Sequence, residues 1–392
     1  MKVNYSWIVL AAVWLLSMAA NILVFAPMPL TGLLISSLNL KHADVGLLVA
    51  LPPLMYVLLS IPGGVMADRW SVRKTAGLGS ILMTIGGVMR GLVSIPILLF
   101  AFTILAGAGI ALTIPNLPKI IASWFSADRV GLATGIYVVT FAIGPALVFA
   151  LTPSILLPAF GGWSGVLLSY GVFTLVVAVV WWILARDKSL SSPKASVISL
   201  LSGVIRAKDL WFLGFITTST NMLWYSVSGW LLYILVGRGF GEVTSGLIVT
   251  LYTLVGIPAL VLFPILSDKL GLRKPLIWIP LLFLGPISYL LPQASQPIIW
   301  ILSALFGILV CGVFSLMFVV PAEFVGLERA GGAMGLVLSI GYLGGLIGPW
   351  LIGYLRDLLG SFWPGFMIVA IITEVAMVLG LVIKETGLKA RS

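Results

Sequence analysis

Side chains that could react or bind are scarce in this sequence, and most lie within long apolar runs. Glu374 is the only acid in the middle of such a run, His42 is the only histidine and Cys311 is the only cysteine. A metal site needs several ligands, and catalysis needs convergent acids, bases or nucleophiles. We therefore expect no metal site, no cofactor and no intrachain disulfide, and an intramembrane enzyme is only a remote alternative. Glu374 fits either proton coupling or a structural hydrogen bond.

Two asparagines are the leading candidates for holding a polar solute. Asn21 and Asn221 each place an amide donor and acceptor in the middle of an apolar run, where an unpaired amide is costly. They could grip a small solute, or they could hydrogen-bond a neighbouring helix. We extend the predicted site to nearby polar and aromatic residues, namely Phe25, Asn116, Lys119, Tyr137, Trp224, Tyr225, Ser228, Tyr252 and Tyr342.

Two basic residues have competing interpretations. Lys119 follows a proline-interrupted stretch and could face the inner mouth of a pathway, or its ammonium could reach the lipid headgroups. Arg90 lies near the outer end of its run and could attract anions, or it could anchor that end at the membrane surface.

These residues must be positioned by helices that cross a lipid bilayer. Of the 392 residues 60% are hydrophobic and 9% charged, which leaves too little polar surface to enclose a water-soluble globule. The apolar runs have the length of about 20 residues that a helix needs to cross the hydrocarbon core. We predict twelve transmembrane helices near 7–34, 45–66, 74–94, 97–118, 130–152, 163–185, 210–236, 244–266, 275–292, 297–321, 331–355 and 363–383.

The basic residues predict the orientation of these helices. With both termini in the cytoplasm, only Lys41, Arg90, Arg238 and Arg356 of the 22 Lys and Arg residues fall at outer ends. This asymmetry follows the positive-inside rule and predicts a multi-pass protein of a plasma (inner) membrane. The net charge of +10 then indicates contact with anionic lipid rather than with nucleic acid.

The sequence repeats itself at an offset of 200 residues. Without gaps, this offset aligns Asn21 with Asn221, Gly46 with Gly246, Asp68 with Asp268, Gly107 with Gly307, and Arg129-x-Gly131-x-Ala133-x-Gly135 with Arg329-x-Gly331-x-Ala333-x-Gly335. Six spans per copy give both copies the same orientation, so the repeat is parallel. We predict a bundle over 1–185, a cytoplasmic linker over 186–209 and a second bundle over 210–392, with a solute cleft between the bundles.

The loop after the second span carries a recognisable motif. Gly64-x-x-x-Asp68-Arg69-x-x-x-Arg73-Lys74, with a second copy around Asp268-Lys269-x-Gly271-x-Arg273, resembles the loop motif of the major facilitator superfamily. The resemblance implies an all-α membrane fold of two pseudo-twofold-related six-helix bundles and secondary transport by alternating access. It also implies a gating latch made of Asp68, Arg69 and Arg73, with Asp268, Lys269 and Arg273 as its weaker counterpart; the alternative is that these charges only set topology.

A second stretch suggests the branch of that family. Pro115-Asn116-Leu117-Pro118-Lys119, followed by Arg129-x-Gly131-x-Ala133-x-Gly135, resembles cyanate permeases and nitrate/nitrite porters. The resemblance implies a monomer that carries a small anion or short organic acid, with protons as a candidate coupling ion. The cavity aromatics and the partial antiporter motif Gly144-Pro145 suggest the alternative, a proton-coupled exporter of hydrophobic drug-like compounds.

Overall fold

The computed structural model describes residues 5–126, 128–188, 206–326 and 329–387. Helices joined by turns and short loops make up all of this part of the chain, and none of its residues is in a strand. They form two compact units. Unit 1 holds the described residues up to 188 and Gly241–Thr250, and unit 2 holds 206–240 and those from Leu251 onward. The predicted boundaries at 185 and 210 stay a prediction, because most of the proposed linker lies outside the described residues.

Unit 1 contains the helices of the first six predicted spans. They are α1 (Tyr5–Phe25), η1 (Met28–Leu30), α2 (Thr31–Leu38), α3 (His42–Arg69), α4 (Val72–Leu92), α5 (Pro96–Thr113), η2 (Ile114–Asn116), α6 (Leu117–Trp124), α7 (Val130–Val138), α8 (Thr140–Leu151), η3 (Thr152–Leu156), α9 (Leu157–Phe160) and α10 (Trp163–Leu184).

Unit 2 contains the helices of the last six. They are α12 (Lys208–Gly237), α13 (Glu242–Leu270, which begins in unit 1), α14 (Pro275–Leu290), η4 (Leu291–Gln293), α15 (Ile298–Leu316), α16 (Val320–Val325), α17 (Ala330–Leu359) and α18 (Trp363–Val382).

Ten of these helical stretches are long and apolar enough to cross a membrane. Several predicted spans consist of consecutive short helices, such as α5, η2 and α6, which together run over Pro96–Trp124. The remaining two predicted spans correspond to α4 and α12, with 21 and 30 residues. Glycines and Arg90 dilute the hydropathy of α4, and hydroxyl-bearing residues dilute that of α12.

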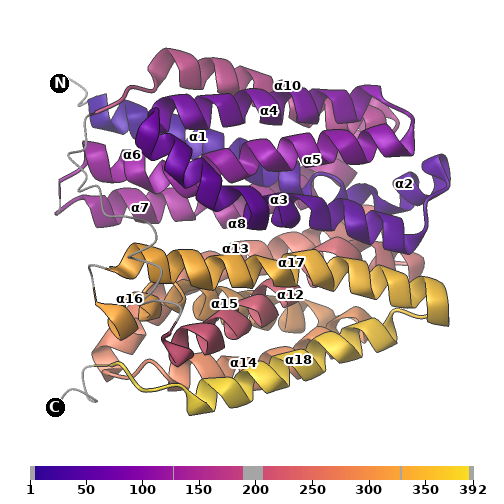
Figure 1. Cartoon of the computed structure of the whole chain (residues 1–392). Helices are drawn as coiled ribbons and strands as arrows, with labels where there is room; N and C mark the ends of the chain where they lie inside the picture. The colour runs from indigo at the N-terminus through magenta and orange to yellow at the C-terminus, as the bar shows by residue number, and fades with distance from the viewer. Residues whose placement is uncertain (1–4, 127, 189–205, 327–328, 388–392) are drawn as a thin grey trace. The chain divides into compact units, whose positions relative to one another are not determined.

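Glycines set the close packing of helices within unit 1. Helix α4 lies against both α5 and α10 (Figure 1). A Cβ added at Gly91 would stand 2.5 Å from the backbone nitrogen of Leu168 on α10, and one added at Gly86 would stand 2.5 Å from that of Ala106 on α5. In lipid, where apolar surface gives no drive for association, such backbone approach supplies the packing energy.

Unit 2 is built on the same principle. Helix α12 packs along α17, and α14 packs along α18 (Figure 1). A Cβ at Gly344 of α17 would overlap the carbonyl oxygen of Thr218 and lie 2.7 Å from the backbone nitrogen of Met222. The glycine-rich stretch of α17 is therefore a packing surface against α12.

Candidate functional site

Asn21 lies on α1 in the interior of unit 1, with 7% of its surface exposed. Its Nδ2 donates to the carbonyl oxygen of Ser17, at 2.9 Å, one turn earlier on the same helix. Gly144 of α8 packs on it, since a Cβ there would lie 2.7 Å from the Cβ of Asn21. One turn away, the hydroxyls of Ser17 and Thr140 form a 2.6 Å hydrogen bond between α1 and α8.

Asn221 occupies the corresponding place on α12 of unit 2, with 6% of its surface exposed. Its Nδ2 is buried and finds no hydrogen-bond partner among the described residues. Gly341 of α17 lies beside it, since an added Cβ would stand 3.3 Å from Nδ2. Thr218 joins the same two helices by donating to the carbonyl oxygen of Ile340, at 2.8 Å. The two amides thus lie in similar surroundings but differ in their hydrogen bonds: Nδ2 of Asn21 makes one, and Nδ2 of Asn221 makes none among the described residues.

The aromatic residues predicted around Asn221 pack on one another inside unit 2. The rings of Trp224 and Tyr252 meet edge to face at 5.2 Å between centroids, and Tyr252 contacts Phe306 similarly at 5.3 Å. The hydroxyls of Ser228 and Tyr252 are hydrogen-bonded. Tyr225 is buried and Tyr342 half-buried. The ring of Tyr252 therefore serves packing, and no face of it is open.

Two predicted site residues of unit 1 compensate for prolines. A proline has no N–H, so the carbonyl four residues earlier loses its helical donor. Pro118 leaves the carbonyl of Ile114 in this position, and the hydroxyl of Tyr137 donates to it at 3.2 Å. Pro27 does the same to Leu23, on α1 two residues beyond Asn21.

Arg90 of α4 supplies the missing donors at Leu23. Its Nη1 and Nη2 donate to the carbonyl oxygen of Leu23 at 3.2 and 3.1 Å. Only 1% of Arg90 is exposed, and its Nε has no hydrogen-bond partner among the described residues. Beyond Leu23, Phe25 meets Phe149 edge to face at 6.4 Å. A role for Arg90 in attracting anions stays a prediction, whereas its support of the end of α1 is observed.

Asn116 and Lys119 bind the backbone of α3. Asn116 Nδ2 donates to the carbonyls of Leu112 at 2.9 Å and Gly63 at 3.2 Å, while its Oδ1 is buried without a hydrogen-bond partner among the described residues. Lys119 Nζ donates to the carbonyl of Gly64 at 3.2 Å and pairs with Asp68 at 2.6 Å. The lysine is therefore tied to the loop motif.

In the first copy of the loop motif, the side chain of Arg73 has neutral partners within unit 1. Arg73 Nη2 donates to the carbonyl of Trp182 at 2.9 Å, and its guanidinium lies 5.6 Å from the centre of the Trp182 ring. Asp187, beyond α10, caps the start of α4 by accepting from the hydroxyl of Ser71 at 2.6 Å and the backbone N–H of Arg73 at 3.1 Å. Arg69 is exposed and makes no polar contact with the described residues.

The second copy forms a network of charges within unit 2. Arg273 pairs with Asp268 at 2.6 Å and with Glu323 at 2.8 Å, and it also donates to the hydroxyl of Ser267 at 2.8 Å. Burial alone lowers the pKa of Arg273, but the hydrogen bonds and charges of Glu323 and Asp268 outweigh burial and raise that pKa above its usual value.

Glu385 accepts hydrogen bonds from the backbone at the start of α14, as Asp187 does at the start of α4. It accepts from the backbone N–H groups of Arg273 at 2.7 Å and Lys274 at 3.1 Å. Lys269, like Arg69, is exposed and makes no polar contact with the described residues. The copy expected to be weaker thus makes more ionic contacts than the first copy.

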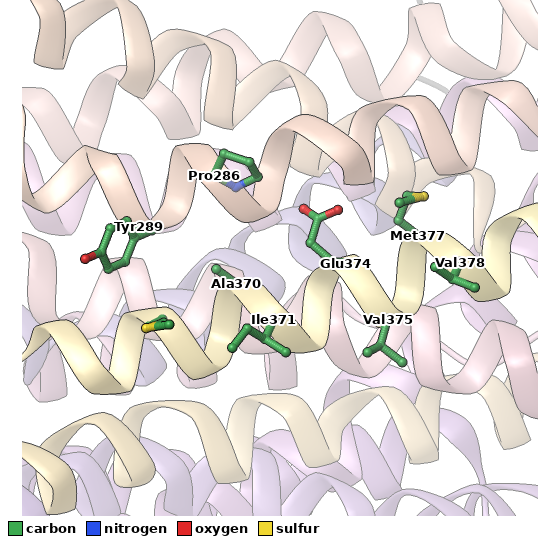
Figure 2. A pocket seen from close by; sticks show the side chains of 9 residues that line it. Pro286, Tyr289, Ala370, Ile371, Glu374, Val375, Met377 and Val378 are labelled. Carbon is green, nitrogen blue, oxygen red and sulfur yellow. The ribbon is translucent and has the colours of Figure 1, made fainter.

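Glu374 lies on α18, in a groove between α18 and α14 (Figure 2). The groove has a volume of about 530 Å³, and apolar residues dominate its lining. The carboxylate lies against Gly285 of α14, where a Cβ would overlap Oε1. Oε1 is buried and has no hydrogen-bond partner among the described residues. Proton coupling through Glu374 stays a prediction.

Several polar residues that contact the predicted site and loop residues could not be identified from the sequence. Glu323, Glu385 and Asp187 lie far in sequence from the motifs that they hold, and Ser17 and Thr140 look like ordinary hydroxyl residues in apolar spans. One signal was present for Arg90, because Pro27 marks Leu23 as a carbonyl in need of a donor. The sequence does not show which side chain reaches it.

Comparison with known proteins fits this architecture. The family model described as Major Facilitator Superfamily matches residues 10–279 and again 213–391. This chain belongs to the Major Facilitator Superfamily. The match confirms the resemblance drawn from the loop motif and the all-α membrane fold, so the chain is a multi-pass membrane transporter of small solutes.

Several curated transporters resemble the chain over most of its length. The 2-nitroimidazole transporter of Escherichia coli is 26% identical over 383 residues, which is 95% of this chain and 94% of the relative. The cyanate transport protein CynX of Escherichia coli is 24% identical, covering 85% and 86%, and a probable nitrate/nitrite transporter NarK2 of Mycobacterium tuberculosis is 25% identical, covering 84% of each.

A solved structure shares the fold of the whole chain. The inward-facing, occupied form of a bacterial homologue of the human lysosomal transporter Spinster gives a TM-score of 0.82, with 18% identity over 99% of both chains. At 18% identity, this likeness shows the fold alone.

Proposed function

We propose that this chain is a secondary active transporter that moves a small anion or short organic acid by rocker-switch alternating access. In the proposed orientation it spans a plasma (inner) membrane with both termini in the cytoplasm, as the distribution of Lys and Arg suggests. The loop residues Asp68, Arg69 and Arg73, with Asp268, Lys269 and Arg273, are the proposed gating latch.

The observation that carries the choice of solute is the unused donor of Asn221. A buried amide N–H without an acceptor costs about 1–3 kcal/mol, and Asn221 Nδ2 is in this state. A solute that presents an oxygen or nitrogen acceptor removes the cost, whereas an ammonium group has only donors to offer. The unused donor therefore favours an acceptor-bearing solute. Asn21 is the second proposed contact, with its Oδ1 and Nδ2 in the corresponding place of unit 1.

The relatives support the same solute chemistry. The names of three of them specify 2-nitroimidazole, cyanate and nitrate or nitrite. All of these solutes are small and carry oxygen or nitrogen atoms that accept hydrogen bonds. The proposal is limited to this class, and the named solutes serve as test compounds.

Equilibrium binding to the purified full chain tests the proposal, with nitrite, nitrate, cyanate, acetate and 2-nitroimidazole as probes. Asn221→Ala should weaken binding of at least one of them tenfold or more, because one hydrogen bond to a charged acceptor is lost, worth about 1.5–3 kcal/mol. Asn221→Asp keeps the size of the side chain but replaces the donor by a carboxylate. It should abolish anion binding, whereas it would strengthen binding of a cationic solute.

Control variants and flux measurements complete the experiment. Gly335→Ala is the matched control, since nothing lies within 4 Å of a Cβ added there. Unchanged affinity for every probe in both Asn21→Ala and Asn221→Ala would remove these amides from the site. In proteoliposomes, anion uptake that responds to an imposed pH gradient would support proton coupling. Dye efflux without anion uptake would overturn the proposal in favour of the drug-exporter alternative.

A further inference from the structure

The groove between α14 and α18 is lined by neither of the two asparagines of the proposed solute site. It is lined by Pro286 and Tyr289 from α14 and by a face of α18 that includes Ile371, Glu374 and Val378 (Figure 2). Its volume of about 530 Å³ lies in the range of small-molecule sites. Apart from the carboxyl of Glu374 and the hydroxyl of Tyr289, no polar side chain lines it.

The carboxylate of Glu374 lacks a partner for its buried oxygen among the described residues. Gly285 lacks a side chain at the point where Oε1 of Glu374 lies, so the carboxylate rests directly against the backbone of α14. Within the described part of the chain, Glu374 forms no salt bridge and its buried Oε1 has no hydrogen-bond partner. A bare carboxylate at such a place is costly unless a proton or a cation accompanies it.

The side chains that surround Glu374 on α18 limit which cations could reach its carboxylate. Met367, Ile371, Val375 and Val378 are each about half exposed along this side of α18. Exposed apolar side chains on a membrane-spanning helix face the lipid, so the groove is entered from the bilayer. A strongly hydrated ion does not take this route, because it would lose its water without gaining further ligands.

The depth of Glu374 excludes a phospholipid headgroup. Glu374 is the twelfth of the 20 residues of α18, about 17 Å from one end of the helix and about 12 Å from the other at 1.5 Å per residue. The ammonium of phosphatidylethanolamine is tied to a phosphate that stays at the membrane surface, and it cannot descend so far without burying that charge.

We propose that this groove binds a lipophilic amine, with the ammonium on the carboxylate of Glu374 and an alkyl or aryl body along the apolar face of α18. The amine nitrogen donates to the carboxylate from the side of the groove, and its single positive charge offsets the cost of a carboxylate whose other oxygen, Oε1, is buried without a hydrogen-bond partner among the described residues. The carbon body contacts Met367, Ile371 and Val375. This site is independent of the solute site proposed above and lies within unit 2.

Photolabelling of the full chain in lipid nanodiscs tests this site. The probe is dodecylamine with a diazirine on its alkyl chain, and the matched neutral probe is the corresponding dodecanol. The amine should label peptides of α14 and α18 saturably, and Glu374→Gln should weaken this labelling about tenfold or more, because the charge-assisted hydrogen bond is lost. Glu242→Gln, at the exposed start of α13, should leave the labelling unchanged.

A second pair of variants tests the geometry. Gly285→Ala places a Cβ where Oε1 lies and should also abolish amine labelling, while Gly335→Ala should not. If Gly285→Ala fails to fold, the Glu374→Gln comparison still decides the question. Equal labelling by amine and alcohol, or amine labelling unchanged in Glu374→Gln, would show a lipid-filled crevice and overturn the proposal. Asn221→Ala should not affect amine labelling, which separates this test from that of the solute site.

Discussion

Replacing the two motif arginines by methionine, one at a time, should destabilise the chain to very different extents. Arg73 and Arg273 are equivalent in the 200-residue repeat, and methionine keeps most of the apolar stem of each side chain. Arg73 donates to a carbonyl oxygen and lies against the Trp182 ring. Arg273 instead lies between two carboxylates, Asp268 and Glu323. The pair is therefore a matched comparison of neutral and ionic partners.

The exposures of the side chains set the magnitudes. The side chains of Arg273 and Glu323 are 10% and 18% exposed, while that of Asp268 is 63% exposed. The exposed pair contributes at most about 1 kcal/mol. Loss of Arg273 leaves Glu323 as a nearly buried, uncompensated charge, and we expect a total cost of about 2–4 kcal/mol. Arg73→Met removes one exposed hydrogen bond to a neutral acceptor and the cation–π contact with Trp182, which together cost about 1–2 kcal/mol.

Thermal unfolding followed by tryptophan fluorescence measures the difference. The apparent melting temperature should fall about twice as far in Arg273→Met as in Arg73→Met. Adding Glu323→Gln to Arg273→Met should recover part of the loss, because the uncompensated charge is gone. Equal losses at the two arginines, or no recovery in the double variant, would refute the assignment of the cost to Glu323.

The pH dependence gives an independent check on Arg273. Its pKa is raised in the fold, so its contribution is fully present below the pKa of the unfolded chain and is lost only as pH rises through the folded value. Both values lie far above neutrality. The gap in melting temperature between the wild type and Arg273→Met should therefore stay constant between about pH 6 and 9. A gap that closes toward pH 9 would contradict a charged, ion-paired Arg273.

Two further predictions concern packing and backbone satisfaction. Tyr137→Phe should lower the free energy of unfolding by about 1–3 kcal/mol, because the Ile114 carbonyl loses its donor; thermal unfolding measures this, with the exposed Tyr354→Phe as control. Gly344→Ala should greatly reduce the yield of monodisperse protein in size-exclusion chromatography, because the added Cβ overlaps the Thr218 carbonyl, whereas Gly335→Ala, with open space around it, should not.

The spans were predictable because length and apolarity alone specify a membrane helix. The predicted spans 163–185 and 363–383 differ by one residue from α10 (Trp163–Leu184) and α18 (Trp363–Val382). The first span was predicted to end at 34, but its apolar stretch continues through α2 to Leu38. Ends are less certain because the residues near them are compatible with either helix or turn.

The partners of the polar side chains were not predictable in the same way. Asn21 and Asn221 both stand out in the sequence. The carbonyl of Ser17, which accepts from Asn21, lies one turn earlier on the same helix, but the sequence does not show that the Nδ2 of Asn221 has no acceptor among the described residues. Similarly, the sequence places Arg90 near the end of a span, but its burial follows from the approach of α4 to the end of α1. The contact of Arg90 with Leu23 joins residues 67 positions apart, and no local pattern encodes it.

The two copies of the repeat keep the same backbone packing while their polar chemistry differs. A Cβ at Gly107 would lie 3.0 Å from the Cα of Pro52, and one at Gly307 would lie 2.8 Å from the Cα of Tyr252, which is 200 residues beyond Pro52. Glycines at these positions fix how closely two helices approach, so any side chain there disrupts the bundle. Polar residues beside them carry no such constraint and can change. The two asparagines show this difference, because Nδ2 of Asn21 donates to the carbonyl of Ser17, whereas Nδ2 of Asn221 has no hydrogen-bond partner among the described residues.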